Sequence, residues 1–134
     1  MTSKLNSLLI TAALTLSAAA AYGQTQVVAN IPFSFRTAAG IQPAGQYAVS
    51  HEGEVTKLRN LDSGRASLAG IGVPEDNDQS KPAQLVFTCG SDTGCALTSV
   101  RLADGRSWSH KALRLKHSEE ARVAVIYLES RQAE

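Results

Sequence analysis

Short runs in which apolar and polar side chains alternate follow one another along most of the chain. In the first of them, at 27–36, Ile31, Phe33 and Phe35 occupy every second position. This period of two is typical of a strand that buries one face. Comparable runs, separated by turn residues, lie at 46–51, 55–61, 66–73, 83–88 and 96–102. The pattern therefore predicts a series of short strands joined by tight turns.

Prolines and glycines mark the ends of these strands. Pro32 cannot donate a hydrogen bond within a sheet, so the strand at 27–36 is predicted to lie at an edge or to carry a bulge. Pro43 and Gly45 suit the second and fourth positions of a type I turn. The segment 74–82 is predicted to be a polar, solvated loop, because the residues between its two terminal prolines include no apolar side chain.

The region before the last strand is ambiguous. Trp108, Ala112 and Leu115 are spaced as on one face of a helix. Residues 113–116, however, alternate in polarity as a strand would. We favour a short helix at about 109–120.

The final run, 122–129, is apolar without a break from Val123 to Leu128, which predicts a strand buried on both faces. Such a strand would lie in the centre of a sheet or beneath the helix. With about seven strands at roughly ten-residue spacing, the chain is predicted to be mainly β, a small antiparallel sandwich or barrel with one short helix before the last strand. The large side chains expected to fill its interior are Phe33, Phe35, Tyr47, Phe87 and Tyr127.

The beginning of the chain has the features of an export signal. Lys4 precedes an apolar run at 8–21, and an A-x-G cleavage site follows. The run is shorter than the about 20 apolar residues that a membrane-spanning helix requires. Residues 1–23 are therefore predicted to be a signal peptide, and 24–134 a single β domain exported to the periplasm or the extracellular space. No membrane span is expected once the signal is removed.

Charge argues against several classes of partner. The chain has 13 Lys and Arg against 12 Asp and Glu, and Lys4 lies in the predicted signal, so the exported domain is formally neutral. Binding of nucleic acid depends on clustered basic side chains, so we expect no nucleic-acid partner. Aromatic residues make up 5% of the chain, which is few for a surface that stacks sugars or bases.

The two cysteines, Cys89 and Cys95, flank a glycine-rich turn between two predicted strands. In an oxidising compartment such a pair is predicted to form a structural disulfide across the hairpin. Thiol–disulfide enzymes place two residues between their cysteines, and the turn here is longer. Two thiolates alone would leave a tetrahedral metal site half filled.

The histidines are not spaced for a metal site. His110 and His117 would be about 10 Å apart along a helix that rises 1.5 Å per residue, too far to share one ion. His51 lies beside Glu52 and Glu54, but neighbouring residues of a strand face opposite sides. The sequence also contains no G-x-S-x-G elbow, phosphate-binding loop or dinucleotide motif. No catalytic residue, metal site or cofactor is therefore predicted.

Two stretches of the exported domain together resemble the opening of a family of small exported bacterial β proteins. They are Ala29–Phe35, with the pattern A-x-I-P-F-x-F, and Pro43–Tyr47, with the pattern P-A-G-x-Y. Members of this family look like a signal peptide, a compact β domain, a short polar helix and an apolar last strand. The family is functionally uncharacterised, so the resemblance implies an architecture and no catalytic residues.

Because no convergent polar site is evident, we expect an exported, soluble, non-enzymatic protein with a binding or structural role in the envelope or outside the cell. One alternative is a small barrel that binds an apolar ligand, in which the five large side chains would line a cavity. A second is a hydrolase-type enzyme that uses His51, His110 or His117, which requires one of them to lie beside a carboxylate, serine or cysteine in a pocket. The partner is unknown, and an exposed edge strand would permit association with another protein or a second copy.

Overall fold

The computed structural model describes residues 25–111, 115–116 and 119–132. This part of the chain forms twelve strands and no helix, and so contains no helix that could cross a membrane. The strands are β1 (Thr25–Ile31), β2 (Phe35–Thr37), β3 (Gly40–Gln42), β4 (Gly45–Glu52), β5 (Val55–Asn60), β6 (Ala66–Ile71), β7 (Val73–Asn77), β8 (Gln84–Gly90), β9 (Gly94–Arg101), β10 (Arg106–Ser109), β11 (Ala121–Tyr127) and β12 (Glu129–Gln132). The predicted signal peptide, residues 1–23, lies outside the described part.

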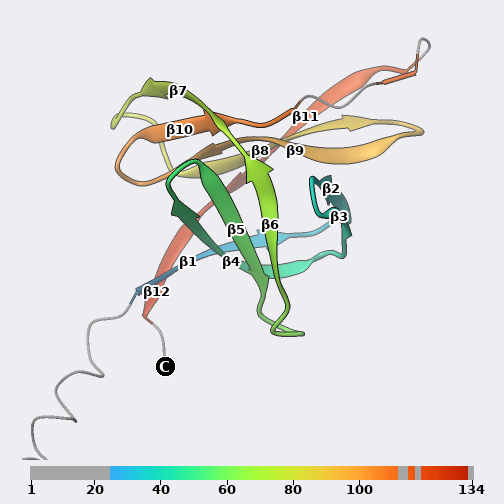
Figure 1. Cartoon of the computed structure of the whole chain (residues 1–134). Helices are drawn as coiled ribbons and strands as arrows, with labels where there is room; N and C mark the ends of the chain where they lie inside the picture. Colours follow the sequence, from blue (N-terminus) through green and yellow to red (C-terminus); the bar gives the residue numbers. More distant parts are fainter. Residues whose placement is uncertain (1–24, 112–114, 117–118, 133–134) are drawn as a thin grey trace, which may run out of the picture.

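The strands form two sheets that pack face to face (Figure 1). The first has the order β12-β1-β4-β5-β6, and the second has the order β11-β8-β9-β10-β7 with the β2–β3 hairpin beside β9. Every pairing is antiparallel except that of β2 with β9. The prediction of a mainly β, largely antiparallel architecture is confirmed, and the described residues fit a sandwich.

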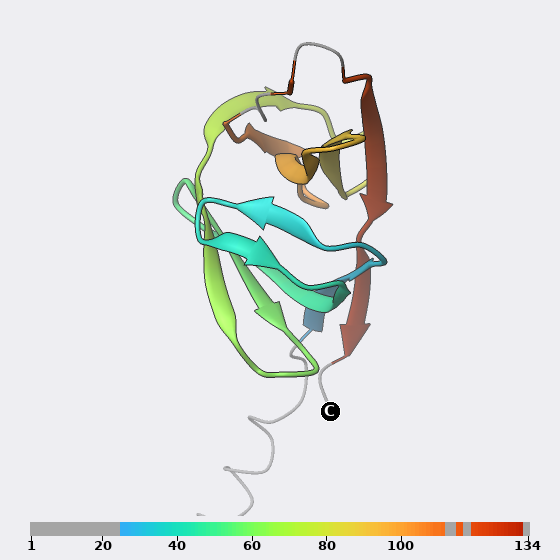
Figure 2. The same cartoon turned by 90° about the vertical axis from the view of Figure 1, so that its right-hand side faces the viewer.

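Two bent strands belong to both sheets and close the sides of the sandwich (Figure 2). On one side β6 continues into β7 through Gly72, and on the other β11 continues into β12 through Leu128. Figure 2 shows the second pair as the long dark-red strand at the right. A Cβ at position 72 would lie 2.6 Å from the Cβ of Trp108, closer than real contacts allow. The close packing at this bend therefore requires glycine.

Aromatic side chains fill the centre of the sandwich. Phe35 of β2 packs edge-to-face against Tyr47 of β4 and Phe87 of β8, with ring centroids 5.3 Å apart in both pairs. Phe33 packs against Phe87 in the same way at 5.1 Å. Such pairs contribute about 0.5–1.5 kcal/mol beyond their hydrophobic burial. Because Tyr47 belongs to the first sheet and Phe87 to the second, Phe35 links the two.

The last strand differs from its prediction. β11 is the edge strand of the second sheet, and Val123, Val125 and Tyr127 on its outer face are 67%, 40% and 62% exposed. Ala124 and Ile126 pack against the core. The unbroken apolar run thus comes from two alternating faces, one inward and one outward. The predictions of a strand buried on both faces and of Tyr127 as an interior residue are therefore wrong.

The short helix predicted at 109–120 is not seen. Trp108 and Ser109 belong to β10, which pairs with β9 and β7. The described residues that follow, up to residue 120, have no regular structure, and 112–114 and 117–118 lie outside the described part. Trp108 is 4% exposed and stacks on His51 of the other sheet, a long-range contact that helical spacing alone does not detect.

Pro32 lies between two strands. β1 stops at Ile31 and β2 starts at Phe35, so Pro32 removes no hydrogen bond from either. β1 lies between β12 and β4, and neither pairing has a register shift, so neither the edge position nor the bulge predicted for 27–36 is seen in β1. The chain passes from the first sheet to the second at this proline, so one alternating run serves both sheets.

Cys89 and Cys95 form the predicted disulfide. They are directly opposite each other in the β8–β9 hairpin, with Cα atoms 4.0 Å apart. Both are partly buried against the core. Closing so short a loop contributes about 2 kcal/mol by chain entropy. The bond therefore reinforces a hairpin that the strand pairing already defines.

The tip of this hairpin is tied to the segment before β11 by Glu119. Its carboxylate accepts hydrogen bonds from the backbone N–H groups of Asp92, Thr93 and Lys116, at 3.1, 3.0 and 2.9 Å, and from the Thr93 hydroxyl. The bond from that hydroxyl is the largest cause that lowers the pKa of Glu119 to about 2. Gly90 permits this approach, because a Cβ there would collide with the carboxylate.

The P-A-G-x-Y segment is closed by a hydrogen bond that Tyr47 donates to the Pro43 carbonyl at 2.6 Å. We expect Tyr47→Phe to lower the free energy of unfolding by about 1 kcal/mol, since it removes this bond and keeps the buried ring. Urea denaturation measures the effect. Tyr127→Phe is the matched control, because its ring is exposed, and it should leave stability unchanged. Equal losses in the two variants would contradict the assignment.

Glu119→Gln should weaken the tie between the hairpin and the segment before β11. Because its pKa is lowered from 4.5 to about 2, Glu119 stabilises the folded protein above pH 4.5, and this contribution is lost as the pH falls toward 2. The variant should unfold at a lower temperature near neutral pH and lose less stability than the wild type between these two pH values. Glu120→Gln, which alters the exposed neighbouring carboxylate, should behave as wild type.

Candidate functional site

Two histidines carried by different sheets lie near one another at one end of the sandwich. His51 is close to the end of β4, where it pairs across the hairpin with Thr56 of β5. Trp108 lies in β10 and His110 follows that strand directly. Packing of β10 over the β4–β5 hairpin brings the four side chains together.

The imidazole of His51 stacks on the indole of Trp108, with ring centroids 3.5 Å apart and an interplanar angle of 19°. The guanidinium of Arg106 lies 5.3 Å from the same indole, in a cation–π arrangement. The Nε2 atom of His51 is buried and has no hydrogen-bond partner within the described residues. Burial, followed by the charge of Arg106, lowers the pKa of His51, so its ring is neutral at pH 7.

His110 is held at both its backbone and its ring. Its N–H donates to the Thr98 carbonyl at 2.8 Å, and its Nε2 lies 3.3 Å from the Oγ1 of Thr56. Burial is the main cause that lowers the pKa of His110, and the charge of His51 acts in the same direction. The two histidines therefore disfavour each other's protonation.

The cluster does not present a nucleophile to solvent. Thr56 is fully buried, so His110 has no accessible hydroxyl to activate. The carboxylate of Asp104 accepts bonds from the backbone N–H and the Nε of Arg106, at 3.0 and 2.6 Å, and none from His51. Within the described residues, no three His, Cys, Asp or Glu side chains could hold a metal ion together. His117 lies outside the described part.

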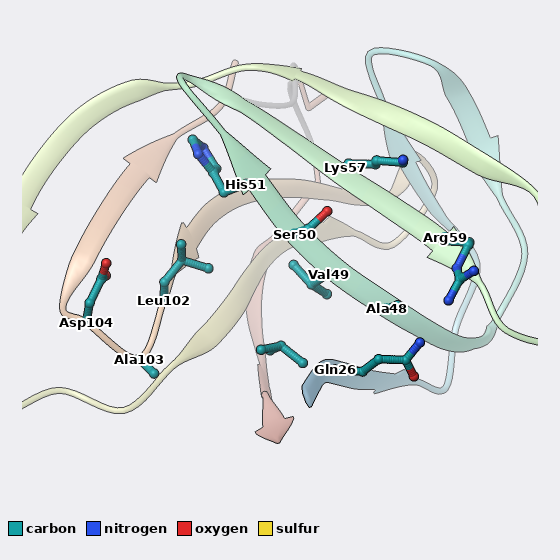
Figure 3. Close-up of a pocket in the computed structure, with 11 residues that line it drawn as sticks. Gln26, Ala48, Val49, Ser50, His51, Lys57, Arg59, Leu102, Ala103 and Asp104 are labelled. Carbon is teal, nitrogen blue, oxygen red and sulfur yellow. The ribbon is translucent and has the colours of Figure 1, made fainter. Parts of the chain in front are cut away.

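A hollow of about 590 Å³ opens beside His51 (Figure 3). It forms because β1 pairs with β4 only through Val28–Ile31, while the beginning of β1 pairs with β12. Figure 3 shows Lys57 and Arg59 on one side and Asp104 on the other. None of the five large side chains predicted to fill the interior lines this hollow. Its walls are of mixed charge and its mouth is open to solvent.

A second hollow of about 620 Å³ opens beside His110. The turn after β2, the end of β6 and part of β9 form its walls. Its ionisable lining residues are Arg36, His110 and Lys111, and the other walls are mostly small or apolar. The charged side chains that line this hollow are therefore all basic, whereas those that line the first hollow include both basic and acidic residues.

A buried arginine of β9 is bonded to β7 and to the turn before β10. Arg101 is 8% exposed and donates to the carboxylate of Asp76 at 2.7 Å and to the carbonyl of Gly105 at 2.8 Å. The Ser107 hydroxyl lies 3.0 Å from the same carboxylate. These bonds, led by the one from Arg101, lower the pKa of Asp76 to about 2. Residues 74–77 belong to β7, so the prediction of a loop throughout 74–82 is wrong.

The sequence contains no local signal for these contacts. Thr56 and His110 are 54 positions apart, and Asp76 and Arg101 are 25 apart. A polar residue at an inward position of an alternating strand is the one available indication. Thr56 fits that pattern, since it lies two positions before Leu58 on the buried side of β5.

His51 and His110 should make the protein less stable in mild acid. Their pKa values lie below 6.5 in the folded protein, so below that pH the unfolded chain binds more protons than the folded one. The contribution of the two neutral histidines to the free energy of unfolding is therefore fully present above about pH 6.5. It is lost as the pH is lowered below this value. Urea denaturation from about pH 8 to about pH 5 measures this slope. The double variant with His51→Gln and His110→Gln should show a smaller slope, and an unchanged slope would contradict the assignment.

Comparison of the chain with protein-family models, with curated proteins and with solved structures finds no match. The resemblance carried by Ala29–Phe35 and Pro43–Tyr47 therefore stays a prediction. The two segments do have a clear structural role, because they supply Phe33, Phe35 and Tyr47 to the aromatic core.

Proposed function

We propose that this protein is exported and non-enzymatic, and that it acts by pairing with an extended strand at the outer edge of β11. The occupant we assign to this edge is a second copy of the chain, which gives the protein a structural, self-associating role. The observation that carries the proposal is the exposed apolar stripe of Val123, Val125 and Tyr127. Apolar side chains gathered on one solvent-facing surface commonly mark a contact with another protein.

β11 differs from the other edge strands of the described residues in being both long and unprotected, since β3, which also lacks charge and proline, has only three residues. Unpaired strand edges attract other strands, and proteins usually block them with charge, proline or a covering segment. β7 carries Pro74 and Glu75, and β12 carries Glu129 and Arg131. The turn after β2 covers part of β6, where the N–H of residue 38 donates to the carbonyl of residue 69 at 3.3 Å. From residue 123 to residue 127, β11 has no charged residue and no proline. One edge pairs with β8, and no strand of the described part pairs with the other edge.

The stripe is complementary to itself. An antiparallel pair of β11 strands centred on Val125 places Val123 of each copy opposite Tyr127 of the other. Aromatic and β-branched residues are favourable cross-strand partners. A shift of one residue would place outward side chains of one copy opposite inward side chains of the other. The difference between the exposed and the buried face of β11 therefore favours the unshifted register. This arrangement has two-fold symmetry and joins the two second sheets into one.

The rest of the molecule is consistent with a non-enzymatic, exported role. The interior aromatic side chains contact one another, which leaves them unavailable to line a cavity for an apolar ligand. The disulfide suits an oxidising compartment. The predicted signal at 1–23 supplies a route to that compartment.

Val125→Lys should abolish self-association, because it places a charge at the centre of the paired edge. Sedimentation velocity over a range of concentrations should detect a dimer for the wild type and a monomer for this variant, with circular dichroism to verify folding. Ile71→Lys is the matched control, since Ile71 is 72% exposed on β6, away from this edge. A wild-type protein that stays monomeric at every concentration, or a Val125→Lys variant that still dimerises, would exclude the proposal.

A further inference from the structure

The hollow beside His110 is kept open by the absence of a side chain at Gly70. Gly70 has a φ of +114°, and a Cβ there would lie 3.0 Å from the Cβ of Ala38 and 3.9 Å from the Nδ1 of His110. The pairing of β5 with β6 is irregular at this point, because it shifts between Thr56 and the next residue. The backbone at Gly70 thus adopts a conformation that favours glycine, and the space left faces the ring of His110.

The charge of this hollow is positive and uncompensated. Arg36, His110 and Lys111 line it, and among the described residues no Asp or Glu does. Within the described residues, neither Arg36 nor Lys111 takes part in an ion pair. The lining therefore offers two cations and an imidazole without an anion of its own.

The ring of His110 is oriented for a contact inside the hollow. Thr56 engages Nε2, which leaves Nδ1 on the side of Gly70 with no hydrogen-bond partner in the described part. A hydroxyl both donates and accepts, so Thr56 can hold Nε2 in the neutral and in the protonated ring. Nδ1 can therefore carry a proton toward a bound anion in either state.

The remaining wall is apolar. Ala38, Ala69, Ile71 and Leu97 contribute to it, and a volume of about 620 Å³ lies within the range of small-molecule sites. We propose that this hollow binds a small organic carboxylate with a short aliphatic chain. The carboxylate would lie between Arg36, Lys111 and Nδ1 of His110, and the chain would lie along the apolar wall. This site is separate from the edge of β11 and does not depend on it.

Titration of the purified protein with hexanoate tests the site, with hexanol and inorganic phosphate as comparison probes. We expect saturable binding of hexanoate by calorimetry, together with an upward shift of the pKa of His110 followed by NMR of its Cε1 proton. Hexanol and phosphate should bind at least about tenfold more weakly. Hexanol has the aliphatic chain but no carboxylate, and phosphate has the negative charge but no aliphatic chain. N-acetylleucine, which imitates a peptide carboxyl terminus, distinguishes a free acid from a chain end as the source of the carboxylate. Whichever of the two acids binds more tightly identifies that source.

Variants then locate the binding. Arg36→Gln and Lys111→Gln should each weaken hexanoate binding about tenfold. Lys57→Gln, which removes a cation from the hollow beside His51, is the matched control and should bind as wild type. Absence of saturable binding, equal binding of hexanol or phosphate, or wild-type affinity in both test variants would overturn the proposal.

Discussion

The packing of Phe35 between Tyr47 and Phe87 is the contact on which the architecture depends. Tyr47 lies in one sheet and Phe87 in the other, so one side chain from a short strand joins both layers. Burial of large apolar surface is the main stabilising contribution in a domain of this size. Aromatic residues make up only 5% of the chain, and all three phenylalanines together with Tyr47 are in this cluster. The surface hollows are consequently lined by small, aliphatic and charged residues.

Once the centre is filled in this way, the sides of the sandwich determine which surfaces are left for function. The bent strands β6/β7 and β11/β12 each pass from one sheet to the other. At the bend, each therefore exchanges its neighbouring strands in one sheet for those in the other. At Gly72 the bend is covered by Trp108. At Leu128 the chain leaves β11, a strand that has apolar side chains both on its inward face and on its outward face. The exposure of Tyr127 is thus a consequence of the same geometry that closes the sandwich.

Local patterns in the sequence predicted what depends on local chemistry. Alternation predicted most strands, the glycine-rich turn predicted the disulfide, and the burial of Phe35, Tyr47 and Phe87 follows from their positions in alternating runs. Tyr127 was predicted wrongly because an apolar run does not reveal whether both faces of a strand are covered. The helix predicted at 109–120 is not seen in the described residues, because helical spacing does not reveal that residues 108 and 109 pair within a sheet. The stacking of His51 on Trp108 depends on the placement of one sheet over the other, which no spacing in the sequence encodes.

The two proposed surfaces are far enough apart in the fold to act independently. β8 separates β11 from β9, which together with β2 and β6 supplies residues to the walls of the hollow beside His110. Strand pairing at β11 therefore leaves that hollow open, and a dimer would present two copies of it. Communication between them would have to pass through the β8–β9 hairpin, which the disulfide and Glu119 hold at its tip.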